Sequence, residues 1–182
     1  MTTCLVLLRG VNVGPAKRVP MAELRTLLGE LGGERVATLL NSGNAVADWP
    51  RARPGTLAPR ISAALRQRFG FDVPVVVKTL AEGQAIAAGM PWPEPPDPAR
   101  LVVVFTADQA DLAALHAVDP LVAPDEAWHI GAQAAYLHCA GGLLQSRAAE
   151  ALLGRAGAAV TTRNWATVGK LLALALAQRS DR

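Results

Sequence analysis

The residues of this chain best suited to chemistry are hydrogen-bond donors grouped in turns. The first group is the run from Arg9 to Gly14 (RGVNVG), which follows an apolar segment. Glycines let successive backbone N–H groups point into one concavity, and such concavities bind anions. The run has neither the spacing of a Walker phosphate loop nor that of a dinucleotide fingerprint, so a purely turn-forming role stays open beside anion binding. The candidate ligand contacts of this group are Arg9, Gly10, Asn12, Gly14 and Lys17.

A second group of donors is the tetrapeptide NSGN, between two apolar segments. Its hydroxyl and amide groups can donate to a ligand, but the same side chains also stabilise turns by bonding their own backbone. Turn formation alone is therefore the simpler interpretation, and ligand binding is the alternative. The candidate contacts of this group are Asn41, Ser42, Gly43 and Asn44.

A third group lies at the start of the last predicted helix. Asn164 is a plausible N-cap, and the positive end of a helix dipole favours an exposed anion by about 0.3 to 1 kcal/mol. Arg163 adds a fork-shaped donor that suits phosphate or carboxylate. We expect Trp165 to pack into the core instead of contacting a ligand. The candidate contacts here are Arg163, Asn164 and Lys170, and Lys78 joins them from a separate predicted strand.

The sequence does not identify a catalytic residue, a cofactor or a metal. His129 and His138 lie on the two strands of a predicted hairpin, but a metal site needs three or four ligands and no carboxylate accompanies them. Ser42 precedes a glycine without the strand and helix context of a nucleophile elbow. We therefore predict no metal and no cofactor, and whether the protein is an enzyme stays open.

The elements that position these groups follow one order in the first part of the chain. Apolar runs predict strands, and apolar residues three or four apart predict helices. The resulting order is strand, helix, strand, strand, helix, strand, which is the split βαβ arrangement of a ferredoxin-like unit. The predicted elements are strands 5–8, 36–40, 45–49 and 73–78, helices 21–31 and 57–69, and a short helix 81–88.

The same order recurs after a segment in which proline occupies five of the eight positions from Pro91 to Pro98. Such a segment interrupts helices and central strands, so it predicts a linker. The predicted organisation is an α+β fold of two tandem ferredoxin-like (α/β plait) units: 1–90, the linker 91–99, and 100–182 with an appended C-terminal helix. The later elements are strands 101–105, 127–130, 135–139 and 160–162, and helices 108–118, 146–154 and 165–178.

Composition narrows the class of protein. The 182 residues are 51% hydrophobic and 18% charged, which is typical of a folded globular chain. We find no uninterrupted apolar stretch long enough for a membrane span and no N-terminal signal core, so we expect a cytoplasmic protein without a membrane partner. Cys4 and Cys139 fall in predicted strands, where a thiol packs as a small hydrophobe. The oligomeric state stays open.

Several segments resemble those of a known family. The segments are LLRGVNVG from Leu7, VPMAELRTL from Val19, LNSGN from Leu40, the stretch Tyr136–Leu143, and TTRNWATVGKL from Thr161. In this order they are similar to the DUF1697 family, whose fold is also called SP0830-like. The resemblance implies a double α/β plait and names no activity or substrate.

Three kinds of function remain open at this point. The clustered donors favour a small anionic ligand carrying phosphate or carboxylate. The net charge of +3 and the plait fold permit an RNA-binding module, but such a platform stacks bases on strand aromatics and the strand Leu5–Leu8 has none. Trp49, Phe105 and Tyr136 lie on other predicted strands. A partner that docks on the leucine-rich last helix is the third alternative.

Overall fold

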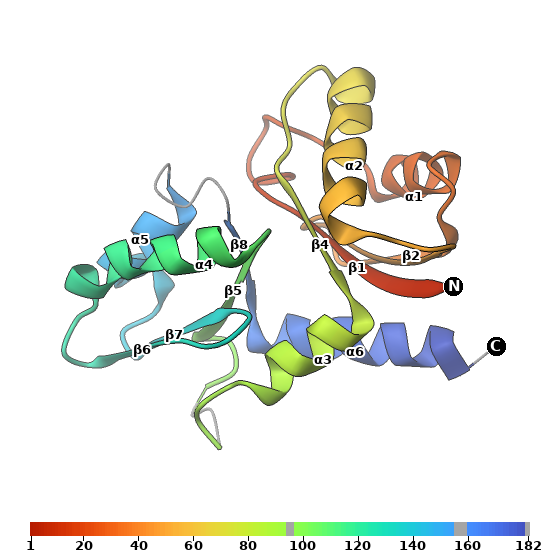
Figure 1. Ribbon diagram of the computed structural model, residues 1–182. Helices are drawn as coiled ribbons and strands as arrows, with labels where there is room; N and C mark the ends of the chain where they lie inside the picture. Colours follow the sequence, from red (N-terminus) through yellow and green to blue (C-terminus); the bar gives the residue numbers. More distant parts are fainter. Residues whose placement is uncertain (94–96, 155–159, 181–182) are drawn as a thin grey trace. The chain divides into compact units, whose positions relative to one another are not determined.

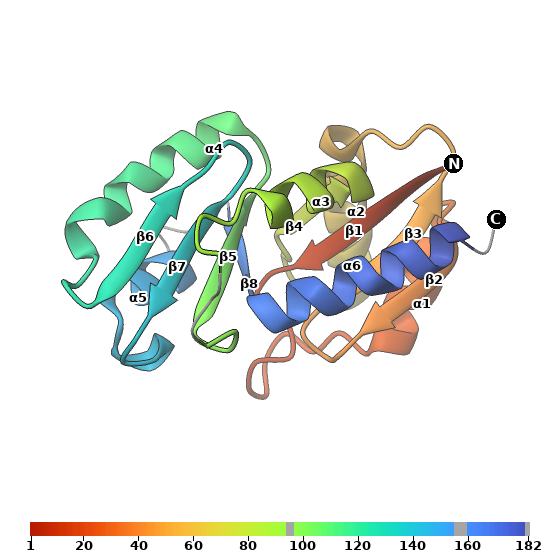
Figure 2. The same cartoon turned by 90° about the horizontal axis from the view of Figure 1, so that it is seen from below.

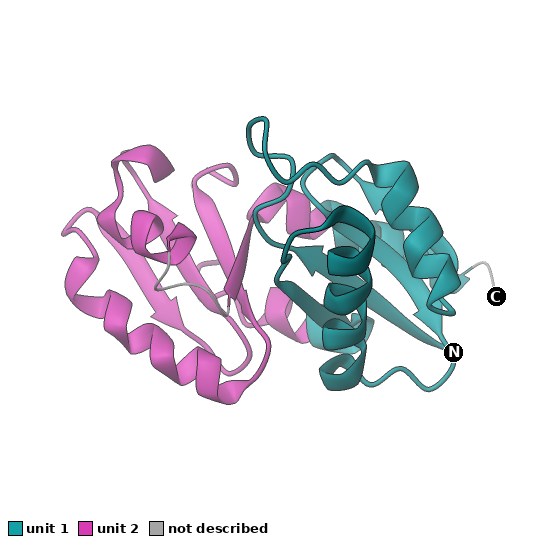
Figure 3. Cartoon of the chain, turned by 90° about the horizontal axis from the view of Figure 1, so that it is seen from above, with its two compact units in different colours: residues 1–83, 170–182 teal, residues 84–169 magenta. Residues whose placement is uncertain are grey.

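The computed structural model describes residues 1–93, 97–154 and 160–180, which form two compact units. Unit 1 combines Met1–Gly83 with Lys170–Arg182, and unit 2 is Gln84–Gly169. Figure 3 shows the two units in different colours. Both boundaries fall inside helices, one within α3 (Leu80–Ala88) and the other within α6 (Trp165–Ser180).

Unit 1 contains a four-stranded antiparallel sheet in the order β2-β3-β1-β4. Helices α1 (Met21–Glu30) and α2 (Pro54–Phe69) cover one face of this sheet (Figure 1). The strands are β1 (Thr2–Leu8), β2 (Glu34–Leu39), β3 (Asn44–Trp49) and β4 (Val75–Thr79).

The core of unit 1 follows from the spacing of apolar residues in its strands and helices. Alternate residues of a strand point to one face, while residues three or four apart share one side of a helix. Strand β1 contributes Cys4, Val6 and Leu8 to this core, opposite residues at helical spacing from the helices. The buried helix residues are Leu24, Leu27 and Leu28 in α1, and Leu57, Ile61 and Leu65 in α2.

The opposite face of the first sheet is covered by the C-terminal part of α6 (Figures 1 and 2). A Cβ at Gly83 would lie 2.8 Å from Leu5 and 3.1 Å from Leu172, so strand and helix side chains meet at this glycine. Near the end of α6, Gln178 Nε2 donates to the carbonyl of Arg35 at 2.7 Å. This face is therefore buried as well.

Unit 2 contains a second four-stranded antiparallel sheet, in the order β6-β7-β5-β8. Its core includes Val104, Leu115, Leu137 and Leu152, so the helical segments pack on one face of the sheet. The strands are β5 (Leu101–Thr106), β6 (Glu126–Ile130), β7 (Ala135–Cys139) and β8 (Val160–Asn164). The helices are α4 (Gln109–Ala114), α5 (Arg147–Leu153) and the 3₁₀ helices η1 (Leu115–Leu121) and η2 (Leu143–Gln145).

The predicted elements are present, with a few differences. The helix expected through Val118 is α-helical only to Ala114 and continues as a 3₁₀ helix that contains Pro120. The predicted caps Asp108 and Ser146 accept hydrogen bonds from Asp111 N and Ala149 N. The predicted linker falls partly on residues 94–96, outside the described residues.

The division of the chain also differs from the expected units 1–90 and 100–182. Most of the last helix groups with unit 1, because residues from Lys170 onward pack on the first sheet. An α+β fold with two antiparallel sheets and a C-terminal helix is thus confirmed. Within the described ranges, no helix is long and apolar enough to span a bilayer.

Candidate functional site

The loop between β1 and α1 is closed on itself by the side chain of Asn12. Asn12 Nδ2 donates to the carbonyl of Val19 at 2.8 Å, and Val19 N donates to Asn12 Oδ1 at 2.9 Å. Asn12 N donates to the carbonyl of Lys17 at 3.1 Å. Both Asn12 and Lys17 have positive φ, 58° and 53°, which asparagine tolerates better than most residues. The loop geometry therefore depends on Asn12.

The same side chain joins this loop to the turn between β2 and β3. Asn12 Nδ2 donates to the carbonyl of Asn41 at 2.6 Å, and Leu8 N donates to the carbonyl of Gly43 at 2.8 Å. A Cβ at Gly43 would lie 2.6 Å from Leu8 Cβ, so only glycine allows this approach. The two polar segments, far apart in sequence, thus meet where β1 ends and β3 begins.

Asn44 has a structural role at this turn. The residue is fully buried, and its Nδ2 donates to the carbonyl of Leu39 at 3.1 Å and to Ser42 Oγ at 2.9 Å. The side chains of Asn12 and Asn44 thus bond within the protein. The exposed glycines and polar residues of the two segments are Gly10, Gly14, Lys17, Arg18, Asn41 and Ser42.

Arg9 lies at the base of this loop. Its backbone N–H donates to the carbonyl of Pro74 at 2.9 Å, which places Arg9 beside the start of β4. The residue is half-buried, and burial lowers the pKa of its guanidinium, because a low-polarity environment disfavours the charged form. We call residues 9–18 together with 41–44 the polar loop.

Lys78 does not belong to the polar loop. It lies on β4 opposite Leu5, whereas Arg9 follows the far end of β1. Leu5 and Arg9 are four residues apart along the strand, which is about 13 Å. Lys78 is 7% exposed, while the polar loop carries exposed cations.

Arg163 and Asn164 lie at the end of β8, in unit 2. Arg163 is 9% exposed, and its Nη1 donates to Thr161 Oγ1 at 2.8 Å and to the carbonyl of Thr162 at 2.7 Å. Burial lowers the pKa of Arg163 to about 10. Asn164 caps α6, since Thr167 N donates to its Oδ1 at 2.8 Å, as predicted.

Other residues near the start of α6 differ from the expectation. Trp165 is only half-buried, although it was expected in the core. Val168 and Leu171 are buried, and Lys170 is exposed.

The two cysteines are buried, and the two strand histidines face other residues of the hairpin. Burial raises the pKa of the Cys4 thiol to about 12 and also raises that of Cys139, and both thiols are free. His129 lies opposite Tyr136, with ring centroids 6.3 Å apart, whereas His138 lies opposite Ala127. In the described part of the chain, no three His, Cys, Asp or Glu side chains cluster as metal ligands would.

The strand aromatics named in the sequence do not form a stacking surface. Trp49 is 4% exposed, and Phe105 and Tyr136 are each 1% exposed. Tyr136 is held by a hydrogen bond from its hydroxyl to the carbonyl of Ile86 at 2.6 Å. Trp128, on β6, is half-buried and donates to Asp119 Oδ1 at 2.8 Å. None of these four aromatic rings exposes a full face on which a base could stack.

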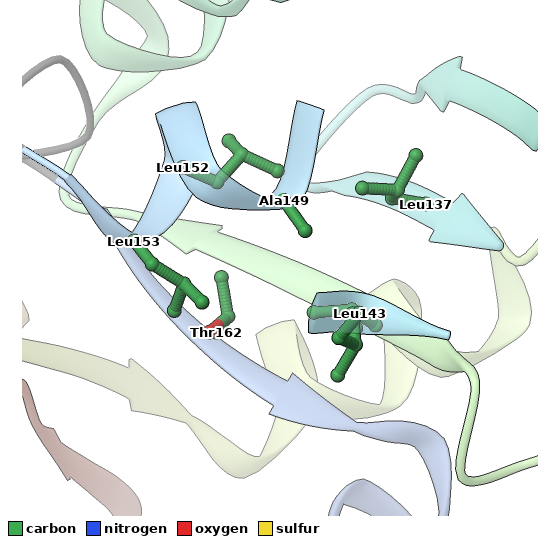
Figure 4. A pocket seen from close by; sticks show the side chains of 7 residues that line it. Leu137, Leu143, Ala149, Leu152, Leu153 and Thr162 are labelled. Atoms are coloured by element: carbon green, nitrogen blue, oxygen red, sulfur yellow. The ribbon is translucent and has the colours of Figure 1, made fainter. Parts of the chain in front are cut away.

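Two features of the structure were not predicted from the sequence. A polar network in unit 1 joins the buried Thr3 and Asp48 to the exposed Arg35; the only signal for it was a carboxylate inside an apolar strand. A small hollow, partly open to solvent, lies in unit 2 (Figure 4). Ordinary core residues line it, so their types gave no signal: Val102, Leu137, Leu143, Ala149, Leu152, Leu153 and Thr162.

Comparisons with known proteins agree with this architecture. A family model described as "Protein of unknown function (DUF1697)" matches residues 1–136. A solved structure of the conserved bacterial protein SP0830 from Streptococcus pneumoniae is similar, with a TM-score of 0.80 and 24% sequence identity. The match covers 96% of this chain and 98% of that chain. No curated protein matches the sequence.

Proposed function

Because the chain belongs to the DUF1697 family, whose description assigns no activity, we propose a function from the site itself: binding of a small anionic ligand at the polar loop. The ligand class is a compound that carries a phosphate or a carboxylate. The observation that supports this proposal most directly is the pair of hydrogen bonds from Asn12 to Val19 and Asn41. These bonds hold two donor-rich segments together at the end of β1.

The donors in this proposal are the exposed members of the polar loop. Lys17 and Arg18 supply positive charge, while the backbone N–H groups of Gly10 and Gly14 lie in turns with φ of 66° and 75°. Asn12, Gly43 and Asn44 act as positioning residues, because their contacts lie within the protein. Arg9 adds a guanidinium at the base of the loop.

The fold proposal that accompanies this function is that each unit is ferredoxin-like. In both units the sheet order places the first and third strands in the centre, and two helical segments follow the first and third strands. This is the order expected of a split βαβ unit. We also place the protein in the cytoplasm, where two free buried thiols are compatible with a reducing environment.

RNA binding is less well supported by the same geometry. A stacking platform requires accessible aromatic rings on the central strands, and Phe105 and Tyr136 are buried. A gel-shift titration with single-stranded RNA at low and moderate salt tests this alternative directly. Retention that is specific for RNA sequence at moderate salt would favour it over the small ligand.

The ligand proposal is tested by thermal unfolding in inorganic phosphate and in chloride at equal ionic strength. A ligand at one hundred times its Kd stabilises the folded state by about 2.7 kcal/mol, which raises Tm by roughly 5 to 10 °C for a chain of this size. We expect phosphate to raise Tm above chloride, and the double variant Lys17→Ala, Arg18→Ala to lose the difference.

The matched control removes the same charge elsewhere. Arg60 and Arg147 are exposed on α2 and α5, so the double variant Arg60→Ala, Arg147→Ala should keep the phosphate effect. Equal losses in the two double variants would show that phosphate responds to net charge alone and would overturn the proposal.

A further inference from the structure

Two apolar side chains at the polar loop are exposed to solvent. Val13 is 78% exposed and Leu40 is 54% exposed. Asn12, which precedes Val13, donates from Nδ2 to the carbonyl of Asn41, which follows Leu40, at 2.6 Å. A single hydrogen bond therefore holds together the two segments that carry these side chains. Exposed apolar residues that gather at one place, beside polar ones, are typical of a surface that binds a partner.

Leu40 is held in its exposed position by the backbone. Its φ is 58°, in the left-handed region that a bulky side chain seldom adopts. The carbonyls of the residues on either side, Leu39 and Asn41, accept hydrogen bonds from the side chains of Asn44 and Asn12. An unusual conformation that surrounding bonds maintain is more frequent at functional positions than elsewhere. The two asparagines that shape the polar loop thus also fix the turn at Leu40.

The loop between β1 and α1 has an uncharged tip above a basic segment. Residues 13–18 (VGPAKR) are all exposed, and the first four of them carry no charge. Asn12 N donates to the carbonyl of Lys17, which closes residues 13–16 into a turn. Figure 2 shows the segment between β1 and α1 extending away from the strands of unit 1. We call residues 13–16 together with Leu40 the apolar tip.

The cations that follow the apolar tip are available to a partner. Lys17 and Arg18 are exposed, and in the described part of the chain no side-chain hydrogen bond or ion pair engages either of them. Arg68, by contrast, is paired with Glu30 at 2.5 Å. An uncharged tip beside two available cations complements a surface that is anionic outside and apolar beneath.

We propose that the apolar tip docks on a membrane surface that contains anionic phospholipids. Lys17 and Arg18 pair with the phosphates of the headgroups, while Val13 and Leu40 enter the boundary with the acyl chains. This inference rests on the proposed anion binding at the polar loop and names the compound that carries the phosphate. A projecting tip needs no hollow of its own, because the lipids close around it.

Surface binding differs from the sequence-based expectation of no membrane partner. That expectation followed from the lack of a long apolar stretch and of a signal core, and a loop that lies on a bilayer needs neither. A peripheral contact of this kind is weak and reversible, since only a few side chains enter the lipid. It is compatible with a cytoplasmic protein.

The exposed apolar side chains favour a membrane over a nucleic acid. A nucleic acid would pair its phosphates with Lys17 and Arg18 but would leave Val13 and Leu40 in water. A bilayer uses both kinds of side chain. Each cation near an anionic surface strengthens binding about fivefold, and burial of an aliphatic side chain strengthens it roughly tenfold.

The test is sedimentation of the full-length protein with vesicles of phosphatidylcholine alone, or of an equal mixture of phosphatidylcholine and phosphatidylglycerol. We expect binding only to the mixed vesicles. The double variant Lys17→Ala, Arg18→Ala should weaken it about 25-fold. The double variant Val13→Ser, Leu40→Ser should weaken it at least tenfold, yet should keep the rise in Tm caused by inorganic phosphate.

Leu144 provides the matched control, because it is 98% exposed and lies in unit 2. Leu144→Ser removes an exposed apolar side chain elsewhere and should leave vesicle binding unchanged. A fluorescence measurement gives a second readout: the emission of Val13→Trp should shift to shorter wavelength on the mixed vesicles, and that of Leu144→Trp should not. All these positions are exposed, so the variants should fold, which their Tm without vesicles checks.

The outcomes separate the membrane from the soluble ligand. A phosphate effect on Tm without vesicle binding would overturn this inference and leave the proposed function intact. Vesicle binding without a phosphate effect would do the reverse. Vesicle binding that survives Val13→Ser, Leu40→Ser would show adsorption by charge alone and would overturn the apolar tip. Retention of single-stranded RNA without vesicle binding would assign the two cations to a nucleic acid instead.

Discussion

At the scale of single residues, the most constrained polar group of unit 1 is the carboxylate of Asp48. The residue is fully buried on β3 and accepts hydrogen bonds from Thr3 Oγ1 at 2.6 Å and from Arg35 Nε at 2.8 Å. Arg35 Nη2 donates to the same carboxylate oxygen, Oδ2, as Nε does, while Oδ1 accepts from Thr3. A buried carboxylate is tolerated only with such partners.

Replacing this carboxylate should destabilise the protein more than any exposed acidic residue would. We expect Asp48→Ala to lower the free energy of unfolding by about 2 to 4 kcal/mol, because Thr3 and Arg35 lose their acceptor. Asp72 is the control, since its ion pair with Arg66 is exposed at both ends and Asp72→Ala should cost under about 0.5 kcal/mol. Urea unfolding measures both, and equal costs would contradict this account of Asp48.

At the scale of elements, the turn between β2 and β3 depends on one close approach. Gly43 has φ of 77°, and a Cβ there would meet Leu8 Cβ at 2.6 Å and Val11 Cγ2 at 2.8 Å. Gly14, in the polar loop, has a nearly equal φ of 75° with nothing within 4 Å. Both glycines have a left-handed backbone, but only Gly43 lacks space for a side chain. Substituting each one therefore distinguishes the cost of the backbone conformation from that of crowding.

We expect Gly43→Ala to destabilise the protein by about 2 to 4 kcal/mol and Gly14→Ala by about 1 kcal/mol. Both variants carry the left-handed penalty of roughly 1 to 2 kcal/mol at most, and only Gly43→Ala adds overpacking of about 1 to 3 kcal/mol. Denaturant unfolding of the two variants checks this. Similar losses in both would mean that the strand shifts to accommodate the methyl group.

The elements themselves could be predicted from the sequence because apolar spacing encodes them locally. Leu57, Ile61 and Leu65 mark one side of α2, and the uninterrupted apolar run of β1 marks a strand with two buried faces. Caps such as Ser146 and Asn164 are also local, since donor and acceptor lie three residues apart.

The candidate site could be predicted only as a set of residue types. The bond from Asn12 to Asn41 spans 29 residues, so nothing near either residue in the sequence indicated that it would form. The burial of Lys78 depends likewise on what packs over β4, while its position in a valine-rich strand showed only that it was a strand residue. Which donors bond within the protein, and which remain exposed, depends on long-range packing.

At the scale of the whole molecule, α6 matters because it completes unit 1 from the far end of the chain. Its residues from Lys170 onward belong to that unit, and Gln178 bonds to Arg35 across 143 residues of sequence. Figure 2 shows the helix lying along the strands of the first sheet. The second face of this sheet is therefore covered by residues distant in sequence.

Substitutions along α6 should reflect this packing. Leu171 is 1% exposed and Leu176 is 41% exposed, so the two leucines form a matched pair on one helix. We expect Leu171→Ala to cost about 2 to 4 kcal/mol, because it leaves a cavity, and Leu176→Ala under about 1 kcal/mol. Urea unfolding measures both, and amide hydrogen exchange in β1 should accelerate only in Leu171→Ala. Unchanged exchange there would contradict the assignment of α6 to unit 1.

The discontinuity of unit 1 has a consequence for synthesis on the ribosome. Gly83 and Lys170, consecutive in the unit, are 87 residues apart in the chain. At about 5 to 20 residues per second, the four strands that emerge first wait roughly 4 to 17 s for the helix that covers their second face. Unit 2, translated in one piece, can finish folding during this interval, so the half of the protein that is made first is the half that matures last.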